Sequence, residues 1–315
     1  MTHTAHHAPT PPTITRIDAT LEATQTVAWP HFAGSTLRGA FGRALRRAAC
    51  ITGQPDCKGC ALRTSCAYGV VFDPAPPAHP LHPSFNDGLP RYLVQAPPLG
   101  ACPLSPGQTQ HFSLLLLPGS EAHHRLIEHI LPAAVEKQLF QPGLFKLVHT
   151  QTSQTPATPQ TKPEPSANPH APSQITLRWL TPLRLQQQGK PLFKPQQLDA
   201  TTLARALLRR QLQWRQLTQT TPPADTPADS LAHTQAAAQC TLNTHNLHWH
   251  DIQRHSGTQN QKLPLGGLIG SAQLRGPHSA LQQLLPLLQL GEHIHIGKET
   301  VMGLGRYQLS AIEPG

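Results

Sequence analysis

Two regions of the chain place histidine close to cations, in patterns that could support proton transfer at a phosphate group. Histidine titrates near neutral pH and can accept or donate a proton, whereas arginine and lysine can hold phosphoryl oxygens. The first region contains His31 and Arg38. The second surrounds a glycine-rich segment and contains His293, His295, Lys298 and Tyr307. Because the chain has 20 histidines, residue type alone selects none of them, and position must decide.

Position favours His31 and Arg38 as the catalytic pair. Arg38 falls near the start of a predicted helix, where free amide groups and the helix dipole favour a bound anion. We therefore predict that His31 is a general acid or base and that Arg38 stabilises developing negative charge. The alternative interpretation is that His31 is an ordinary surface residue.

The glycine-rich segment at residues 297–305 is suited to phosphate contact. Its glycines allow positive φ and a close approach of the backbone, so that amide groups could face a phosphate without an intervening Cβ. His293 and His295 would share one face of an extended strand beside it. The alternative is a tight turn that only joins a helix to a strand. The predicted contact residues in this region are His295, Lys298, Arg306 and Tyr307.

Four cysteines follow the spacing Cys-x6-Cys-x2-Cys-x5-Cys and could close a tetrahedral zinc site. Reduced thiols in a small knob are an equal alternative, and an iron–sulfur cluster is a weaker one. Four protein ligands leave no open coordination position, so such a zinc ion would be structural. The candidate ligands are Cys50, Cys57, Cys60 and Cys66. Cys102 and Cys240 are isolated in sequence and are predicted to be packing residues.

The elements that must position these residues follow the order β-α-β-β-α-β in the first half of the chain. Apolar and polar residues alternate over 13–27, which predicts a strand, and apolar residues recur at helical spacing from Leu37 to Ala48. The segment 34–36 offers an N-cap for this helix. Strands near 91–96 and 109–117, a helix over 121–139 and a strand over 143–151 complete a ferredoxin-like unit. The first helix should carry four arginines opposite its apolar stripe: Arg38, Arg43, Arg46 and Arg47.

The same order of elements recurs in the second half. A strand at 174–180, a helix at 198–217, strands near 238–250 and 267–274, a helix at 278–289 and a strand near 305–312 predict a second ferredoxin-like unit. Residues 218–229 are polar and predict a loop. The long helix carries Arg205, Arg209, Arg210 and Arg215, which fit either a surface that follows phosphates or an ordinary solvated face.

A proline-rich segment separates the two units. We therefore predict an α+β protein with a flexible tail (1–11), an N-terminal domain (12–151), a linker (152–173) and a C-terminal domain (174–315). The first domain would contain the Cys-rich segment 50–68 as a knuckle inserted after its first helix.

The charge balance predicts a polyanionic partner. Lys and Arg total 25 against 16 Asp and Glu, a net charge of +9 before any histidine is protonated. Only 5% of the residues are Phe, Trp or Tyr, so base stacking should not dominate the binding of a nucleic acid. No stretch approaches the roughly 18 consecutive apolar residues of a membrane span, and we expect a cytoplasmic protein without a membrane partner.

Two motif blocks resemble a known family. Gly34-Ser-Thr-Leu-Arg-Gly-Ala-Phe-Gly42, followed by the four cysteines and Tyr68, is similar to the N-terminal signature of the CRISPR pre-crRNA processing endoribonucleases, which are Cas6-type proteins of the RAMP superfamily. The glycine-rich stretches 266–276 and 291–307 are similar to the C-terminal region of the same family. The resemblance covers about three quarters of the chain, leaving out the tail and the two polar segments.

The resemblance implies two ferredoxin-like domains and an activity. Members cut precursor CRISPR RNA within the repeat, without a metal, by attack of a 2′-OH, and retain the product. The implied partners are CRISPR repeat RNA, folded as a hairpin, and other CRISPR effector subunits, with no cofactor for catalysis. From the placement of charge and the glycine-rich segment, we predict RNA contacts at Arg43, Arg46, Arg47, Arg205, Arg209, Arg210, His295, Lys298, Arg306 and Tyr307.

Two other functions remain open at this point. The chain could be a non-catalytic crRNA-binding subunit of an effector complex, since the same fold serves both roles. A zinc-knuckle nucleic-acid binder outside the CRISPR systems would explain the cysteines and the charge, but would leave the two glycine-rich motifs unexplained.

Overall fold

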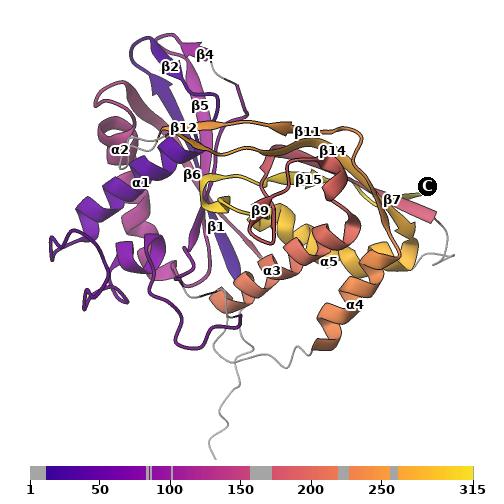
Figure 1. Cartoon of the computed structure of the whole chain (residues 1–315). Helices are drawn as coiled ribbons and strands as arrows, with labels where there is room; N and C mark the ends of the chain where they lie inside the picture. The colour runs from indigo at the N-terminus through magenta and orange to yellow at the C-terminus, as the bar shows by residue number, and fades with distance from the viewer. Residues whose placement is uncertain are drawn as a thin grey trace, which may run out of the picture.

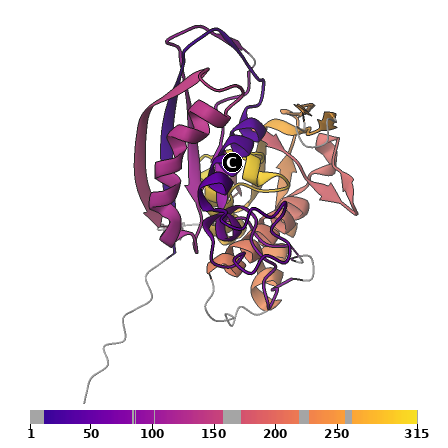
Figure 2. The same cartoon turned by 90° about the vertical axis from the view of Figure 1, so that its left-hand side faces the viewer.

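The computed structural model of the chain describes residues 12–314, apart from 83, 84, 86, 101, 157–171, 219–226 and 256–261. The fold is α+β and contains two ferredoxin-like units, as predicted, which lie side by side in both views (Figures 1 and 2). Within these ranges no helix has the length and apolar character needed to cross a membrane.

The first unit is built on a four-stranded antiparallel sheet. Its elements are β1 (Thr13–Ala23), α1 (Gly34–Ala49), β3 (Tyr92–Gln95), β5 (Thr109–Leu116), α2 (His124–Gln138) and β6 (Phe145–Pro156). The strand order is β3-β5-β1-β6, the arrangement that a ferredoxin-like unit requires. One face of β1 presents Ile17, Ala19 and Leu21 to the helices, because side chains alternate along a strand. The apolar stripe of α1 packs into the same core.

The second unit repeats this arrangement. Its elements are β7 (Pro172–Leu183), α3 (Ala200–Thr218), α4 (Pro227–Ala238), β10 (Thr241–Asn243), β11 (Leu247–His250), β14 (Gly267–Pro277), α5 (His278–Ile294) and β15 (Tyr307–Leu309). The strand order β10-β14-β7-β15 is equivalent to that of the first sheet, with β11 pairing β14 and β16 (Glu313–Pro314) pairing β7. Helices α3, α4 and α5 contact one another.

Short elements complete the chain. They are β2 (Val27–Trp29) paired with β4 (Cys102–Leu104), β8 (Gln186–Gln187) paired with β9 (Lys190–Pro191), β12 (Gln253–His255) paired with β13 (Lys262–Pro264), a π-helical turn η1 (Tyr68–Phe72), and the 3-10 turns η2 (Glu121–His123), η3 (Pro195–Gln197) and η4 (Thr300–Met302).

Several predicted boundaries are wrong. Helix α4 begins inside the segment 218–229 that was predicted as a loop, and β6 and β7 extend into the predicted linker, to Pro156 and from Pro172. Helix α1 begins at Gly34, with Ala33 before it and no side-chain cap. The predicted tail (1–11) and the centre of the predicted linker lie outside the described residues.

The outer face of the first sheet packs against helices of the second unit. Ile14, Leu93 and Leu115 lie on the face opposite the first core and contact Trp214 of α3 and Ile294 of α5. The next positions along these strands, two residues on, are polar and open into a cleft between the units. The first sheet and the helices of the second unit therefore meet through an apolar contact, beside which the sheet carries polar side chains.

The two motif blocks also meet. The turn η4, within the glycine-rich segment, packs against α1 and β3 of the first unit. A Cβ added at Gly34 would lie 1.9 Å from the carbonyl oxygen of Met302, and one added at Gly303 would lie 2.4 Å from that of Val94. Glycine is needed at both positions because backbone approaches backbone there.

Candidate nucleic-acid interface and active site

His31 lies on the surface where the two units meet. It follows β2 and precedes α1, and its backbone carbonyl accepts a hydrogen bond from the amide of Gly100 (3.0 Å). Its Nε2 lies 2.7 Å from Nε2 of His250, the last residue of β11 in the second unit. The ring centroids are 4.9 Å apart and tilted by 34°. An exposed imidazole pair therefore spans the junction between the units.

The environment of His250 favours its neutral form. The side chain is half-buried, and burial lowers its pKa first, followed by the nearby His31 and His248. Asp251 acts in the opposite direction. Its carboxylate accepts a hydrogen bond from the indole Nε1 of Trp249 (2.7 Å).

The structure does not join Arg38 to His31. The Arg38 guanidinium lies over the ring of Phe72, 4.9 Å from its centroid, and its Nε is buried without a hydrogen-bond partner among the described residues. The buried hydroxyl of Tyr92 is nearby, and burial raises its pKa. Arg38 therefore packs inside the first unit rather than on the solvated face predicted for it.

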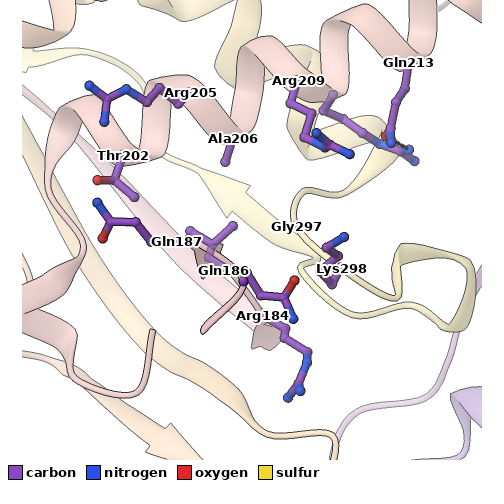
Figure 3. A pocket seen from close by; sticks show the side chains of 13 residues that line it. Arg184, Gln186, Gln187, Thr202, Arg205, Ala206, Arg209, Gln213, Gly297 and Lys298 are labelled. Carbon is purple, nitrogen blue, oxygen red and sulfur yellow. Dashed lines mark hydrogen bonds between the residues drawn. The ribbon is translucent and has the colours of Figure 1, made fainter. Parts of the chain in front are cut away.

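A basic pocket of about 330 Å³ opens between α3, the turn after β7 and the glycine-rich segment (Figure 3). Its lining contains no carboxylate but five cations: Arg184, Arg205, Arg209, Arg210 and Lys298. The structure thus brings together four of the predicted RNA contacts, from α3 and from the glycine-rich segment. Gln186, Gln187 and Thr202 add neutral donors and acceptors. Like charges converge here without a neutralising acid, which is the property of an anion site.

The cations of the basic pocket differ in how freely their side chains can reorient. Arg205 and Arg209 are exposed, the latter with its guanidinium over Phe85 (5.8 Å). Lys298 is exposed, and its backbone amide donates to the carbonyl of Arg184 (2.9 Å). These three side chains can reorient toward a phosphate. Arg184 was not among the predicted RNA contacts. It directly follows the last residue of β7.

Arg210 is held by the protein itself. Its Nε and Nη2 donate to the carbonyl of Ile294 (3.0 and 2.7 Å), and Nε also donates to that of His295 (3.1 Å). Nη1 donates to Oε1 of Gln213 (2.8 Å). Burial lowers the Arg210 pKa to about 10. Arg210 therefore satisfies the end of α5, where free carbonyls attract a cation.

The predicted RNA contacts at His295 and Tyr307 are wrong because both side chains are buried. His295 is 0% exposed and has φ +59°, with Nε2 3.2 Å from Nε2 of Gln95 and Nδ1 without a partner among the described residues. Burial, then Arg306 and Arg210, hold its pKa well below the usual value. The Tyr307 hydroxyl donates to the carbonyl of Leu288 (2.5 Å).

The predicted strand around His293 and His295 is also wrong. Helix α5 continues to Ile294, because Leu290, Gly291 and Ile294 are buried against the rest of the protein. His293 consequently lies in the last helical turn and is exposed, whereas His295 is the residue that ends the helix. The two rings do not share one face.

Arg306 borders the cleft between the two units. This cavity measures about 340 Å³, and β1, β3 and β5 line it with both polar and apolar side chains. Arg16 donates from Nε to Asp18 (2.8 Å), from Nη1 to Gln95 (2.7 Å) and from Nη2 to Ser113 (2.6 Å). The half-buried Arg306 faces this network, and burial lowers its pKa. Sequence reasoning missed Arg16; the i, i+2 spacing of Arg16 and Asp18 on a strand was the available signal.

The other arginines of α1 form a separate basic surface. Arg43, Arg46 and Arg47 line a cavity of about 380 Å³ beside Cys50. Arg43 donates from Nη2 to the carbonyl of Gln138 (2.5 Å), and Arg46 donates to the carbonyl of Pro55 (2.8 Å). Arg47 is exposed. This surface agrees with the basic face predicted for α1, although two of its three cations already bind carbonyl oxygens.

The four cysteines of the Cys-rich segment line one small pocket. The amide of Cys60 donates to the carbonyl of Cys57 (3.2 Å), and the amide of Gly69 donates to Sγ of Cys66 (3.2 Å). Sγ of Cys50 and Sγ of Cys60 lie on either side of the Thr52 hydroxyl (3.7 and 3.8 Å). In the described part of the chain, however, no three side chains of His, Cys, Asp or Glu gather closely enough to hold a metal ion. Zinc at this segment stays a prediction.

The comparisons with known proteins cover both units. The family described as CRISPR-associated endoribonuclease Cas6 matches residues 177–307, and the N-terminal domain family AF_1859_N matches residues 11–163. The Cas6 match spans the second sheet, the basic pocket and the glycine-rich segment. The second unit of this chain is therefore similar to the Cas6 family. The AF_1859_N match contains α1 and His31.

Solved Cas6 structures have the same fold. A Cas6 product complex matches with TM-score 0.57 and 17% identity, over 94% of this chain and 99% of that one. Cas6 from Thermus thermophilus matches with TM-score 0.55 and 15% identity, over 96% and 100%. A chain of a partial Cas6-RT-Cas1–Cas2 complex matches with TM-score 0.57 and 14% identity; 96% of this chain is covered, but it spans only 46% of that one. A search of curated proteins found no match.

Proposed function

We propose that the chain is a CRISPR RNA-processing endoribonuclease that cuts repeat RNA without a metal ion. The observation that carries the proposal is the accessible His31 imidazole at the junction of two ferredoxin-like units, in a chain whose second unit matches the Cas6 family. Similar solved structures include a Cas6 product complex. His31 supplies proton transfer, and the cations of the basic pocket hold the RNA backbone.

The RNA is bound chiefly through its phosphates. The basic pocket offers exposed cations on α3 and on the glycine-rich segment, and the arginines of α1 offer a second site. The cleft beside Arg306 lies between the two units and offers polar side chains next to apolar ones, so it suits unpaired nucleotides, which present both polar edges and apolar faces. A repeat hairpin as the bound form, and other CRISPR effector subunits as partners, stay predictions.

A non-catalytic crRNA-binding subunit is the second candidate function. One observation favours it: Arg38, the predicted charge-stabilising residue, is packed over Phe72 and makes no hydrogen bond to His31 among the described residues. If no other cation reaches the scissile phosphate, the chain would bind the RNA and leave it intact.

Cleavage of labelled repeat RNA in EDTA tests the proposal. We expect a single cut that leaves a 5′-hydroxyl and a 2′,3′-cyclic phosphate or its 3′-phosphate product. A 2′-deoxy nucleotide at the cut site should abolish cleavage and leave binding nearly intact, because the 2′-oxygen is the nucleophile. Tight binding without any product between pH 6 and pH 9 would establish the binding subunit instead.

A further inference from the structure

We propose that His250 is a second catalytic histidine, which acts with His31 as a general base–general acid pair. The inference rests on the proposed function, because it assigns roles within the same site. It concerns a residue of the second unit that sequence reasoning did not single out. It also gives His31 a catalytic partner, which Arg38 does not provide.

The contact between the two rings carries the argument. The Nε2 atoms lie 2.7 Å apart, a hydrogen-bond distance that requires one nitrogen to carry a proton and the other to present a lone pair. Cleavage through a 2′-OH starts from the same combination, one imidazole ready to accept a proton and one ready to donate. The free protein thus places a proton donor and a proton acceptor at a single point.

The surroundings of the pair distinguish it from the structural histidines. His295 is enclosed and bonded to Gln95, whereas His31 is exposed and His250 half-exposed. Among the described residues, the rings of His31 and His250 hydrogen-bond only to each other. The pair also joins the two units. If a phosphodiester entered between the rings, both Nε2 atoms would lose their contact with each other and could turn toward it.

We assign the role of general base to His250. The charged groups that face it are His31 from the first unit and His248 and Asp251 from its own strand and the residue after it. Burial, His31 and His248 lower its pKa and outweigh Asp251, so the ring stays neutral further into the acidic range. A base must be neutral when the substrate binds, which leaves His31 to act as the acid.

The step is balanced in atoms and charge. Nε2 of His250 takes the proton from the 2′-OH, the 2′-oxygen forms a bond to phosphorus, and the bond from phosphorus to the 5′-oxygen breaks. The leaving 5′-oxygen takes the proton from Nε2 of His31. The products are a 2′,3′-cyclic phosphate and a 5′-hydroxyl. Once the two RNA fragments have dissociated, the rings come into contact again, and the proton returns from His250 to His31.

A substrate with sulfur in place of the bridging 5′-oxygen separates the two roles. A thiolate leaves without being protonated, so this substrate no longer needs the acid but still needs the base. Single-turnover cleavage would be measured for the wild type, His31→Ala and His250→Ala on both substrates. His245→Ala is the matched control, because His245 is an exposed histidine just before β11.

We expect His250→Ala to cleave both substrates about 10²–10⁴-fold more slowly than the wild type. His31→Ala should be similarly slow on the oxygen substrate but should recover nearly fully on the sulfur substrate. His245→Ala should match the wild type. The acidic limb of the pH–rate profile, which reports loss of the neutral base, should disappear in His250→Ala. RNA affinity and melting temperature should stay unchanged; if His250→Ala is unfolded, His250→Gln replaces it.

Two results would overturn the inference alone: a folded His250→Ala that cuts the oxygen substrate within threefold of the wild type, or sulfur rescue of His250→Ala rather than His31→Ala. A wild-type protein that binds but never cuts repeat RNA would overturn the proposed function itself. The two failures are therefore distinguishable.

Discussion

Histidines that looked equivalent in the sequence occupy opposite environments in the structure. His31 is exposed and bonded to His250, whereas His295 is 0% exposed, between Gln95 and the cations Arg306 and Arg210. Desolvation and like charge both oppose protonation of His295. The glycine-rich segment therefore contributes Lys298 to the surface, while the preceding His295 is buried at the junction between the units.

Burial of neutral His295 predicts that acid destabilises the protein. The folded pKa lies well below the usual value of about 6.5, so the unfolded chain binds the extra proton and stability falls as pH drops below about 6.5. The loss for one such group approaches about 1.4 kcal/mol per pH unit. His295→Asn, which tolerates positive φ, should flatten the curve of unfolding free energy between pH 7 and pH 5. His149→Asn, at an exposed position of β6, should leave the slope unchanged. Parallel curves for the wild type and His295→Asn would contradict the assignment.

Element packing explains why two motifs far apart in sequence act together. The start of α1 and the glycine-rich segment make backbone contact at Gly34 and Met302, so each holds the other in place. His31 lies three residues before the start of α1, and Lys298 lies two residues before the start of η4. A shift of α1 against the glycine-rich segment would therefore disturb both the histidine pair and the basic pocket.

Gly34→Ala should destabilise the protein and slow cleavage. The new Cβ would lie 1.9 Å from the Met302 carbonyl oxygen and 2.5 Å from the Phe32 ring, and overpacking of this kind costs about 1–3 kcal/mol. Gly39→Ala is the matched control on the same helix, where a Cβ meets only the flexible end of Arg43 at 3.2 Å. Because Ala also favours the helix, Gly39→Ala should be neutral or stabilising. Thermal melting and cleavage rates check both variants; equal melting temperatures would show that the contact is not tight.

The Cys-rich segment makes a second prediction at this scale. We expect freshly purified protein to contain one zinc ion per chain. The four cysteines that line one pocket would bind it as thiolates. A chelator should then lower the melting temperature, and Cys57→Ser should lose the metal. Elemental analysis measures zinc and iron in the same sample. Absence of both metals, with four thiols that react freely, would establish reduced cysteines instead.

On the scale of the whole molecule, the cations converge although the chain is only moderately basic. Eight basic residues lie between 174 and 220, but only some of them reach the basic pocket, where Lys298 joins them from about 90 residues further along. A polyanion that follows this surface releases counterions, so its affinity must fall as salt rises.

The basic pocket predicts a measurable change in salt dependence. Arg205→Gln combined with Arg209→Gln should weaken binding of repeat RNA and lower the slope of log affinity against log salt by about one unit per phosphate contact removed. Arg125→Gln, an exposed arginine on α2 that does not line the pocket, is the control and should change neither quantity. Fluorescence anisotropy between 50 and 300 mM salt, chosen to bracket roughly physiological ionic strength, measures both. An unchanged slope in the double variant would place the RNA elsewhere.

The amino-acid sequence by itself determined the elements and their order. Periodicity is local, so the β-α-β-β-α-β plan of each unit and most of the basic face of α1 could be predicted. The boundaries around α4 and the end of α5 could not, because burial of residues such as Leu290 and Ile294 extends a helix past its local signals.

Only the tertiary structure decided which side chains meet. His31 and His250 are separated by 219 residues, and no local pattern marks one histidine among 20 as the partner of another. In the same way, the enclosure of His295 and the packing of Arg38 over Phe72 depend on how the two units and η1 pack together. Contacts of this kind are set by shape and burial across the whole molecule, whereas residue spacing reports only on near neighbours.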